Sequence, residues 1–273
     1  MSRIIFSSQK ITQHVTRILD GSDVCEYLIE GNEKALLIDT GYGIGDLKGF
    51  VDTLTKKPYE VYMTHAHVDH GGGAYAFGKV HLHYRDQELF KTSCSLKMRI
   101  DMVKNHVGLK IHHADFLPVK SVTFEDIEDG EVVDLGGYHV KFVHTPGHTQ
   151  GIMVPIFIED RIAMFGDACG VGSLLLLKES GTVEQYLDSL KKLQKHEEEY
   201  DRVLRQHGTM ESTKQVLEDN IENCKEILAG TDDHVRDEFL GYECWWAKRI
   251  DPLTGKRADG REGNIRYAAD HIR

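Results

Sequence analysis

The chain has 273 residues, a length that fits one large α/β domain or two small ones. Its 40% apolar content supplies a sizeable core, and a net charge of −11 opposes an extended phosphate-binding surface, so nucleic acid is not an expected partner. No window approaches the roughly 18 apolar residues of a membrane span, and residues 1–6 lack the apolar stretch of a signal peptide.

The first part of the chain predicts a hairpin, a third strand and a helix. Residues 11–19 and 24–29 alternate as strands around an Asp-Gly-Ser-Asp turn. The strand expected at 34–38 ends at Asp39, where an aspartate either caps a turn or hydrogen-bonds a neighbouring loop. Apolar residues recur with a helical period over 46–55.

The strand expected at 59–63 leads into a Thr-His-Ala-His-Val-Asp-His run that three glycines follow. In extended backbone His65 and His67 point the same way, whereas Asp69 and His70 need a turn to aim at separate points. Such a segment can supply ligands to two neighbouring metal ions, and its imidazoles and carboxylate suit zinc, iron or manganese. A solvated histidine-rich loop is the simpler alternative, which the preceding strand and the glycines disfavour.

Two further histidine pairs are interpreted as structural residues and not as metal ligands. His81 and His83 would form one polar face of a strand at 80–83, and His112-His113 would lie in a connecting loop. Residues 84–106 predict helix, in two pieces. We therefore expect a helical insertion at about 84–117, whose apolar side chains line a substrate pocket.

The remaining segments alternate between short strands and helices. Strands are expected at 118–124, 131–135, 138–143, 152–158, 161–165 and 203–204, and helices at 182–196 and 211–229. Two β/α halves would divide somewhere in 106–120. Residues 231–273 predict a loosely structured or partly helical C-terminal extension of a domain spanning 1–230.

The extension differs from the rest of the chain in charge. Residues 247–273 carry seven Lys/Arg and four Asp/Glu, a net charge of +3. This tail would dock on the acidic body, meet an anionic substrate or form a dimer contact, so a homo-oligomer is one expectation. The five cysteines are scattered without a C-x-x-C pair, which is typical of reduced thiols in a cytoplasmic protein.

Polar residues stand at four strand ends where the strand cores do not need them. They are the segment 65–70, His148 in Thr-Pro-Gly-His-Thr, Asp167 in Gly-Asp, and His207 in Gln-His-Gly. Five histidines and two aspartates make seven ligands. Two metal ions that share one carboxylate and one water need about that number.

With Asp39, this ordered set resembles the metallo-β-lactamase-fold hydrolase superfamily, across residues 35–208. The resemblance implies an α/β fold, an αββα four-layer sandwich of two mixed β-sheets flanked by helices. It implies two Zn²⁺ ions, or iron or manganese in their place. The first metal would be bound by His65, His67 and His148, and the second by Asp69, His70 and His207. Asp167 would bridge the two ions. Asp39 would orient one of the ligands without binding a metal itself.

The resemblance also implies hydrolysis by a metal-bridging hydroxide, with Asp69 and Asp167 as catalytic residues and Asp69 as a proton relay. His67 and the lack of a flavodoxin-like domain disfavour an oxidoreductase, and the 40 residues from Asp167 to His207 leave no room for an RNA-processing insertion. A glyoxalase II-like or lactonase-like hydrolase of a small ester, lactone, thioester or amide is the expectation. A phosphodiesterase or nuclease of the same fold is the alternative, and a metal-binding structural or sensor protein is the non-enzyme one.

Overall fold

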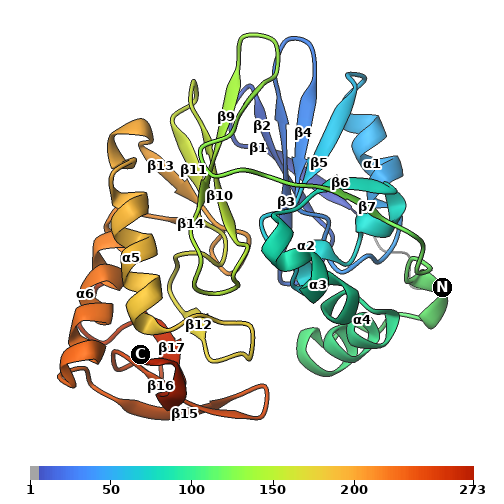
Figure 1. Cartoon of the computed structure of the whole chain (residues 1–273). Helices are drawn as coiled ribbons and strands as arrows, with labels where there is room; N and C mark the ends of the chain where they lie inside the picture. The colour runs from blue at the N-terminus through green and yellow to red at the C-terminus, as the bar shows by residue number, and fades with distance from the viewer. Residues whose placement is uncertain (1–5) are drawn as a thin grey trace. The chain divides into compact units, whose positions relative to one another are not determined.

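The computed structural model describes residues 6–273 (Figure 1), so most of the segment expected to lack a signal peptide lies outside the described residues. Contacts divide the chain into two units. Unit 1 runs up to Phe142 and also holds Phe157–Asp160 and Gln206–Gly208, and unit 2 holds the rest. The division expected at 106–120 is wrong, because the strand Thr123–Glu125 pairs with Lys79–His81 and keeps the chain in unit 1.

Unit 1 contains a seven-stranded sheet whose strands follow one another in chain order, β1 to β7. The strands are β1 Ser7–Lys10, β2 Val15–Leu19, β3 Cys25–Glu30, β4 Ala35–Ile38, β5 Tyr59–Tyr62, β6 Lys79–His81 and β7 Thr123–Glu125. Strands β1 to β4 pair antiparallel, and β4 to β7 pair in parallel. Parallel strands end at the same edge of a sheet, so the residues that follow β4 and β5 meet there.

Helices connect the parallel strands of unit 1, and all but the short one at Val68–Gly71 lie where the sequence predicts helix. They are α1 Leu47–Leu54, α2 Val68–Gly71, α3 Tyr84–Ser93 and α4 Leu96–Met102, followed by a π-helical turn at Val103–Val107. The side chain of Asp46 caps α1 by accepting from Gly49 N (2.9 Å). His83 lies outside the strand expected at 80–83, because it caps α3 and accepts from Arg85 N (3.3 Å).

The second sheet has the order β14-β13-β11-β10-β9-β8. Its strands are β8 Val132–Asp134, β9 His139–His144, β10 Met153–Phe157, β11 Ile162–Met164, β13 Arg202–Leu204 and β14 Glu211–Ser212. The predicted hairpin of β8 and β9 is confirmed: Gly136 and Gly137 both have positive φ, 87° and 82°, as a tight two-residue turn requires. Of the strand expected at 118–124, only the end falls within β7.

Unit 2 has its own apolar core, to which two long helices contribute. Helices α5 Val183–Gln194 and α6 Gln215–Ala229 lie side by side (Figure 1). They bury Tyr186 and Leu190 of α5 with Ile221 and Cys224 of α6, the apolar stripe that the 3.6-residue period predicts.

The C-terminal residues form strands, so the expectation of a loose or partly helical extension at 231–273 is wrong. Strands β15 Val235–Phe239, β16 Tyr242–Trp246 and β17 Ile265–Tyr267 join β12 Ser173–Leu175 in a four-stranded sheet of order β12-β17-β16-β15. Leu240 and Gly241 form the β15–β16 turn with positive φ, 52° and 82°. Leucine rarely takes this conformation, so the turn gives no signal in the sequence.

Candidate metal centre

Asp39 is the hydrogen-bonding hub at the strand edge of unit 1. Its side chain is fully buried and accepts from four donors, two of them on Thr64: the backbone N–H (2.7 Å) and Oγ1 (2.9 Å). His70 Nδ1 (2.8 Å) and Gln206 Nε2 (2.9 Å) complete the set. Because these donors converge on one side chain, Asp39 orients the residues around it. Of the two roles expected for Asp39, these bonds fit the second, in which it hydrogen-bonds neighbouring loops.

The chain turns sharply between Thr64 and Gly73. The expectation that this turn aims Asp69 and His70 at separate points is wrong, because Asp69 Oδ2 lies 3.6 Å from His70 Nε2. His67 is the N-cap of the single-turn helix α2. Thr40 holds His70 in place, because its backbone N–H (2.7 Å) and Oγ1 (2.9 Å) both donate to the carbonyl oxygen of His70. A methyl group at Gly73 would collide with the backbone oxygen of Thr40, so this close approach requires glycine.

Unit 1 brings together three ligand-type atoms from Asp69, His70 and His207. His70 Nε2 lies 3.2 Å from His207 Nε2, and Asp69 Oδ2 lies 3.1 Å from His207 Nε2 and 3.6 Å from His70 Nε2. Ligands 2.0–2.1 Å from a tetrahedral zinc ion are about 3.3 Å from one another. The three separations match that spacing, so this trio fits one face of a metal coordination sphere.

His207 reaches the trio although it is distant in sequence, because Gln206–Gly208 belongs to unit 1. Residue 207 forms a β-bridge with Val24, and the backbone oxygen of Gln206 accepts from Cys25 N (3.0 Å). His207 Nδ1 donates to the backbone oxygen of Asp23 (2.9 Å). These bonds hold His207 at the edge where β3 begins.

His65 and His67 form a second pair in unit 1. Both side chains are buried, and their ring centroids are 4.8 Å apart. Thr64 Oγ1 lies 3.0 Å from His65 Nδ1. The single hydroxyl proton of Thr64 is donated to Asp39, so Oγ1 accepts from His65 Nδ1–H and the lone pair of His65 is on Nε2.

Unit 2 brings together the two predicted ligands that follow β9 and β11. His148 Nε2 lies 3.4 Å from Asp167 Oδ2, again the spacing of two ligands of one ion. His148 Nδ1 donates to the backbone oxygen of Leu174 (3.1 Å). Tyr186 of α5 supports both loops, since its ring packs against Gly147 and its hydroxyl donates to the backbone oxygen of Ala168 (2.8 Å).

Sequence reasoning missed the residues that hold the ligands. Two of them, Thr64 and Gln206, donate to Asp39. Thr40 donates to His70 in the histidine turn, residues 64–73. Asp86, which is fully buried, accepts from Ala66 N (3.1 Å) in the same turn. Their residue types are common and form no motif in the sequence, so their roles follow only from the residues that they contact in the folded chain. Among residues 6–273, the groups of metal-ligand side chains do not include His81, His83, His112 or His113, as expected.

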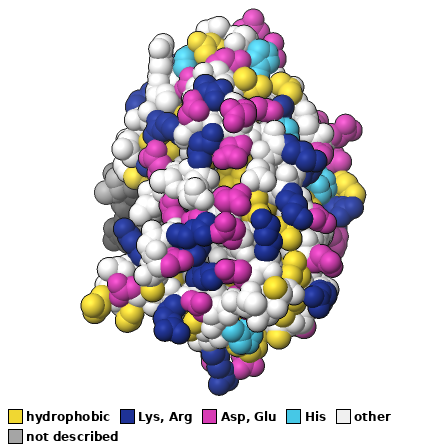
Figure 2. Space-filling model, turned by 90° about the vertical axis from the view of Figure 1, so that its left-hand side faces the viewer, with side chains coloured by type: hydrophobic (Ala, Val, Ile, Leu, Met, Phe, Trp, Pro, Cys, Tyr) yellow, Lys and Arg dark blue, Asp and Glu magenta, His cyan; other side chains and the backbone are white. Residues whose placement is uncertain are grey.

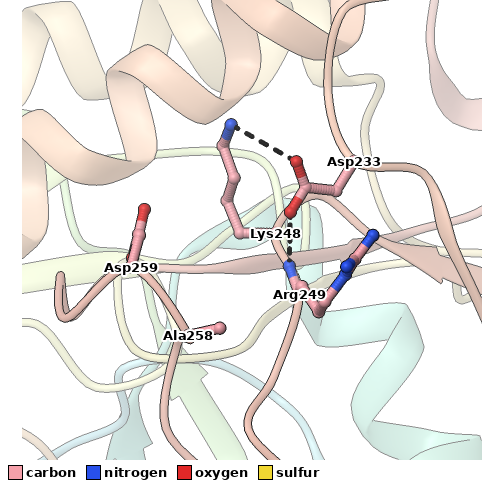
Figure 3. A pocket seen from close by; sticks show the side chains of 5 residues that line it. All are labelled: Asp233, Lys248, Arg249, Ala258 and Asp259. Carbon is pink, nitrogen blue, oxygen red and sulfur yellow. Dashed lines mark hydrogen bonds and ion pairs between the residues drawn. The ribbon is translucent and has the colours of Figure 1, made fainter.

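A shallow depression in unit 2 is a poor alternative to the metal centre as the functional site. Figure 3 shows its lining residues Asp233, Lys248, Arg249, Ala258 and Asp259. The Lys248 ammonium lies 2.5 Å from Glu226 and 3.9 Å from Asp233, and Asp233 also accepts from Arg249 N (2.9 Å). These charges neutralise one another locally. Acidic and basic side chains are similarly interspersed over the face drawn in Figure 2.

None of the helices in residues 6–273 combines the length and the apolar character needed to cross a membrane.

The similarity to known proteins extends over the residues of this candidate metal centre. The family model described as the metallo-beta-lactamase superfamily matches residues 27–207. The chain is 24% identical over 186 residues to the human acyl-coenzyme A thioesterase MBLAC2, covering 61% of this chain and 66% of that protein. It is 26% identical over 195 residues to the atrochrysone carboxyl ACP thioesterase of Emericella nidulans, covering 69% of this chain and 54% of that protein. The chain thus spans somewhat less than two thirds of these relatives.

Solved structures agree with this result at the level of the fold. A metallo-beta-lactamase from Pontibacter korlensis superposes with a TM-score of 0.59 at 16% identity, covering 81% of this chain and 99% of that one. The sec-alkylsulfatase Pisa1 from Pseudomonas sp. gives a TM-score of 0.63 at 16% identity, covering 83% of this chain and 42% of that one. The predicted fold class, α/β with mixed sheets and helices in this sandwich fold, is confirmed.

Proposed function

Because the chain belongs to the metallo-β-lactamase superfamily, we propose that it is a dinuclear metal-dependent hydrolase of a small-molecule thioester or related ester. The observation that carries the proposal is the trio Asp69, His70 and His207, whose ligand atoms are spaced as a tetrahedral ion requires. The relatives named as thioesterases favour a thioester among the expected carbonyl substrates.

The two ions of this proposal would take the ligands that the family resemblance implies. His65, His67 and His148 would hold one, Asp69, His70 and His207 the other, and Asp167 would bridge. Five of these residues belong to unit 1, and His148 and Asp167 belong to unit 2. Zinc is the proposed metal, with iron or manganese as the alternatives that its nitrogen and oxygen ligands also suit.

Bound divalent ions would polarise the substrate carbonyl and lower the pKa of a water molecule toward neutrality. The protein supplies the rest. His70, held by Asp39, keeps its proton on Nδ1, and His207 does the same through Asp23. Asp69 is partly exposed, with 16% of its side chain accessible, so its carboxylate can pass a proton to the leaving group.

An apolar surface beside the histidine turn supports an acyl substrate. Val68, between His67 and Asp69, packs into a cluster with Val103 and Phe116. Partly buried side chains border that cluster: Leu96, Ile100, Met102, Val107, Leu109 and Ile111. The segment 84–117 expected to line a substrate pocket contains all six. We propose that this surface binds the acyl chain.

Substrate panels test this proposal. The zinc-loaded protein is assayed on thioesters of increasing acyl length, p-nitrophenyl esters, lactones and bis-p-nitrophenyl phosphate. We expect thioester turnover whose kcat/KM rises by up to about fourfold per methylene, the equivalent of about 0.8 kcal/mol for a buried CH₂. Phosphodiester turnover without ester or thioester turnover would instead favour a phosphodiesterase.

A matched pair of variants checks the acyl surface. Ile100→Ser should flatten the dependence on chain length, because it replaces an apolar side chain at the border of the cluster. Val119→Ser is the control, since Val119 is 54% exposed and lies outside the cluster. Metal analysis accompanies the assay, and a reconstituted protein that binds no metal would refute the proposed function. The cytoplasmic location, the homo-oligomer and the division at residue 230 stay predictions.

A further inference from the structure

Glu26 of β3 is a buried carboxyl group that the proposed chemistry does not use. Its side chain is 1% exposed, and within residues 6–273 neither Oε1 nor Oε2 has a hydrogen-bond partner. A buried carboxylate without donors costs several kcal/mol. A group of this kind in a folded protein calls for an explanation in terms of its surroundings.

Glu26 lies directly behind the hub of the metal centre. Strands β3 and β4 pair Tyr27 with Ile38, so the next position along the register sets Glu26 opposite Asp39. Just beyond Asp39, a methyl group at Gly41 would collide with Glu26 Oε1. Glycine at position 41 is therefore what lets the carboxyl group fit behind the loop that follows β4.

Gln206 approaches the same place from the other side. Its side chain is fully buried, and its amide Nε2 donates to Asp39 Oδ2 (2.9 Å). Its backbone oxygen accepts from Cys25 N, next to Glu26 (3.0 Å). Gln206 Oε1, like both oxygens of Glu26, is a buried acceptor without a hydrogen-bond partner in residues 6–273. Both side chains thus flank Asp39, and each has acceptor atoms that need a donor.

A proton on Glu26 would remove the charge of this buried carboxyl group and supply a donor for Gln206 Oε1. An ionised carboxylate only accepts hydrogen bonds, whereas a protonated one also donates. Burial raises the pKa of Glu26 well above its usual value, and the nearby carboxylates of Asp20 and Asp39 raise it further while His70 opposes them. Burial without a donor favours the neutral form of Glu26, which has an O–H to donate.

We propose that Glu26 is a positioning residue of the metal centre, which donates a hydrogen bond from its protonated carboxyl group to Gln206 Oε1, directly or through one buried water. This bond holds the amide of Gln206 with its NH₂ toward Asp39. A flipped amide would set Oε1 against the Asp39 carboxylate, and two acceptors in contact repel. The chain Glu26–Gln206–Asp39–His70 then fixes the imidazole that faces Asp69 and His207.

The inference rests on the proposed metal centre, so its test reads metal affinity and protonation rather than turnover. Glu26→Gln keeps the shape and a donor, and Glu26→Met keeps the length without a donor. Glu30→Gln and Glu30→Met are the matched controls, because Glu30 lies on the same strand and pairs with Lys10 near the surface. Zn²⁺ binding to the metal-free proteins is measured by competition with a chromophoric chelator.

We expect Glu26→Gln to bind zinc within about twofold of the parent protein. Glu26→Met should weaken one of two zinc ions by roughly 10–100-fold, the usual effect of losing a partner behind a metal ligand. Equal losses in both variants would overturn the proposal, because they would mean that the site needs an ionised carboxylate, as a buried cation site would. Unchanged affinity in Glu26→Met would overturn it as well.

A second measurement does not depend on metal or on the folding of Glu26→Met. In the infrared spectrum at neutral pH, the parent protein should show a C=O band of a protonated carboxyl group that Glu26→Gln removes and Glu30→Gln retains. If no such band is lost, the proposal fails. A parent protein that binds no zinc would refute the proposed function, and this spectrum would still decide the state of Glu26.

Discussion

At the scale of single residues, the centre is defined by which ring nitrogen of each histidine carries the proton. Nδ1 of His70 donates to Asp39, that of His207 to the Asp23 carbonyl and that of His148 to the Leu174 carbonyl. His65 donates in the same way to Thr64 Oγ1. Carboxylate and carbonyl oxygens only accept, so the lone pair of each ring is on Nε2. All four imidazoles are therefore held in the form that binds a metal ion.

Asp69 is the residue whose substitution separates metal binding from proton transfer. Asp69→Asn keeps an oxygen that can bind a metal ion but removes the carboxylate that carries a proton. We expect kcat to fall by roughly 10²–10⁴-fold, the usual contribution of a positioned acid or base, while the zinc content per chain stays near that of the parent protein. Steady-state kinetics with metal analysis of the same samples measures both quantities.

Asp101→Asn is the control for this substitution, because Asp101 pairs with Lys97 on the exposed side of α4. It should change neither turnover nor zinc content. Equal losses of turnover and zinc in Asp69→Asn would show that Asp69 acts only as a ligand.

At the scale of elements, one buried aspartate attaches the C-terminal segment to α6. Asp219 is fully buried and accepts from the backbone N–H groups of Glu262 (2.8 Å) and Gly263 (3.0 Å), and from Arg261 Nε (2.8 Å). These bonds fix the residues that lead directly into β17. Asp219→Asn places an amide where donors converge, so we expect the free energy of unfolding to fall by about 2 kcal/mol.

The effect of Asp219→Asn should depend on pH. Burial raises the pKa of Asp219, but the bonds from Gly263, Glu262 and Arg261 outweigh it and hold the pKa below its usual 3.8. A lowered pKa contributes stability above pH 3.8 that is lost as pH falls through the folded-state value. Urea unfolding should therefore show a difference at pH 7 that shrinks below pH 3.8. Asp188→Asn on the exposed face of α5 is the control, and a pH-independent difference would contradict this account.

Sequence patterns predicted the elements that carry the ligands and failed where pairing partners are distant. The strand ends before Asp39, His65 and His207 follow from short apolar runs, which are local signals. The strands β15 and β16 lack a strict alternation of apolar and polar residues, and their sheet is completed by β12, about 60 residues earlier in the chain. Likewise, the hydrogen bond from Gln206 to Asp39 joins residues 167 positions apart, which no pattern along one chain reveals.

At the scale of the whole molecule, the proposed metal ions and the stability of the fold are linked. An ion that binds only the folded chain stabilises it by an amount that grows with the logarithm of its free concentration, about 2.7 kcal/mol at 100 times the dissociation constant. The ligands of unit 1 come from the histidine turn and from Gln206–Gly208, which are far apart in sequence. Unfolding separates them, so an unfolded chain retains no comparable site.

Removing metal should therefore lower the thermal unfolding midpoint of the zinc-loaded protein. For a chain of this size, about 2.7 kcal/mol corresponds to roughly 5–10 °C, and differential scanning fluorimetry with and without a chelator measures it. His207→Ala should start near the lower midpoint and respond little to the chelator, because it removes one member of the trio. His81→Ala should keep the full response, since the His81 ring stacks on Tyr62 at 4.0 Å and is outside the ligand groups. Equal chelator responses in both variants would mean that the ion binds elsewhere on the chain.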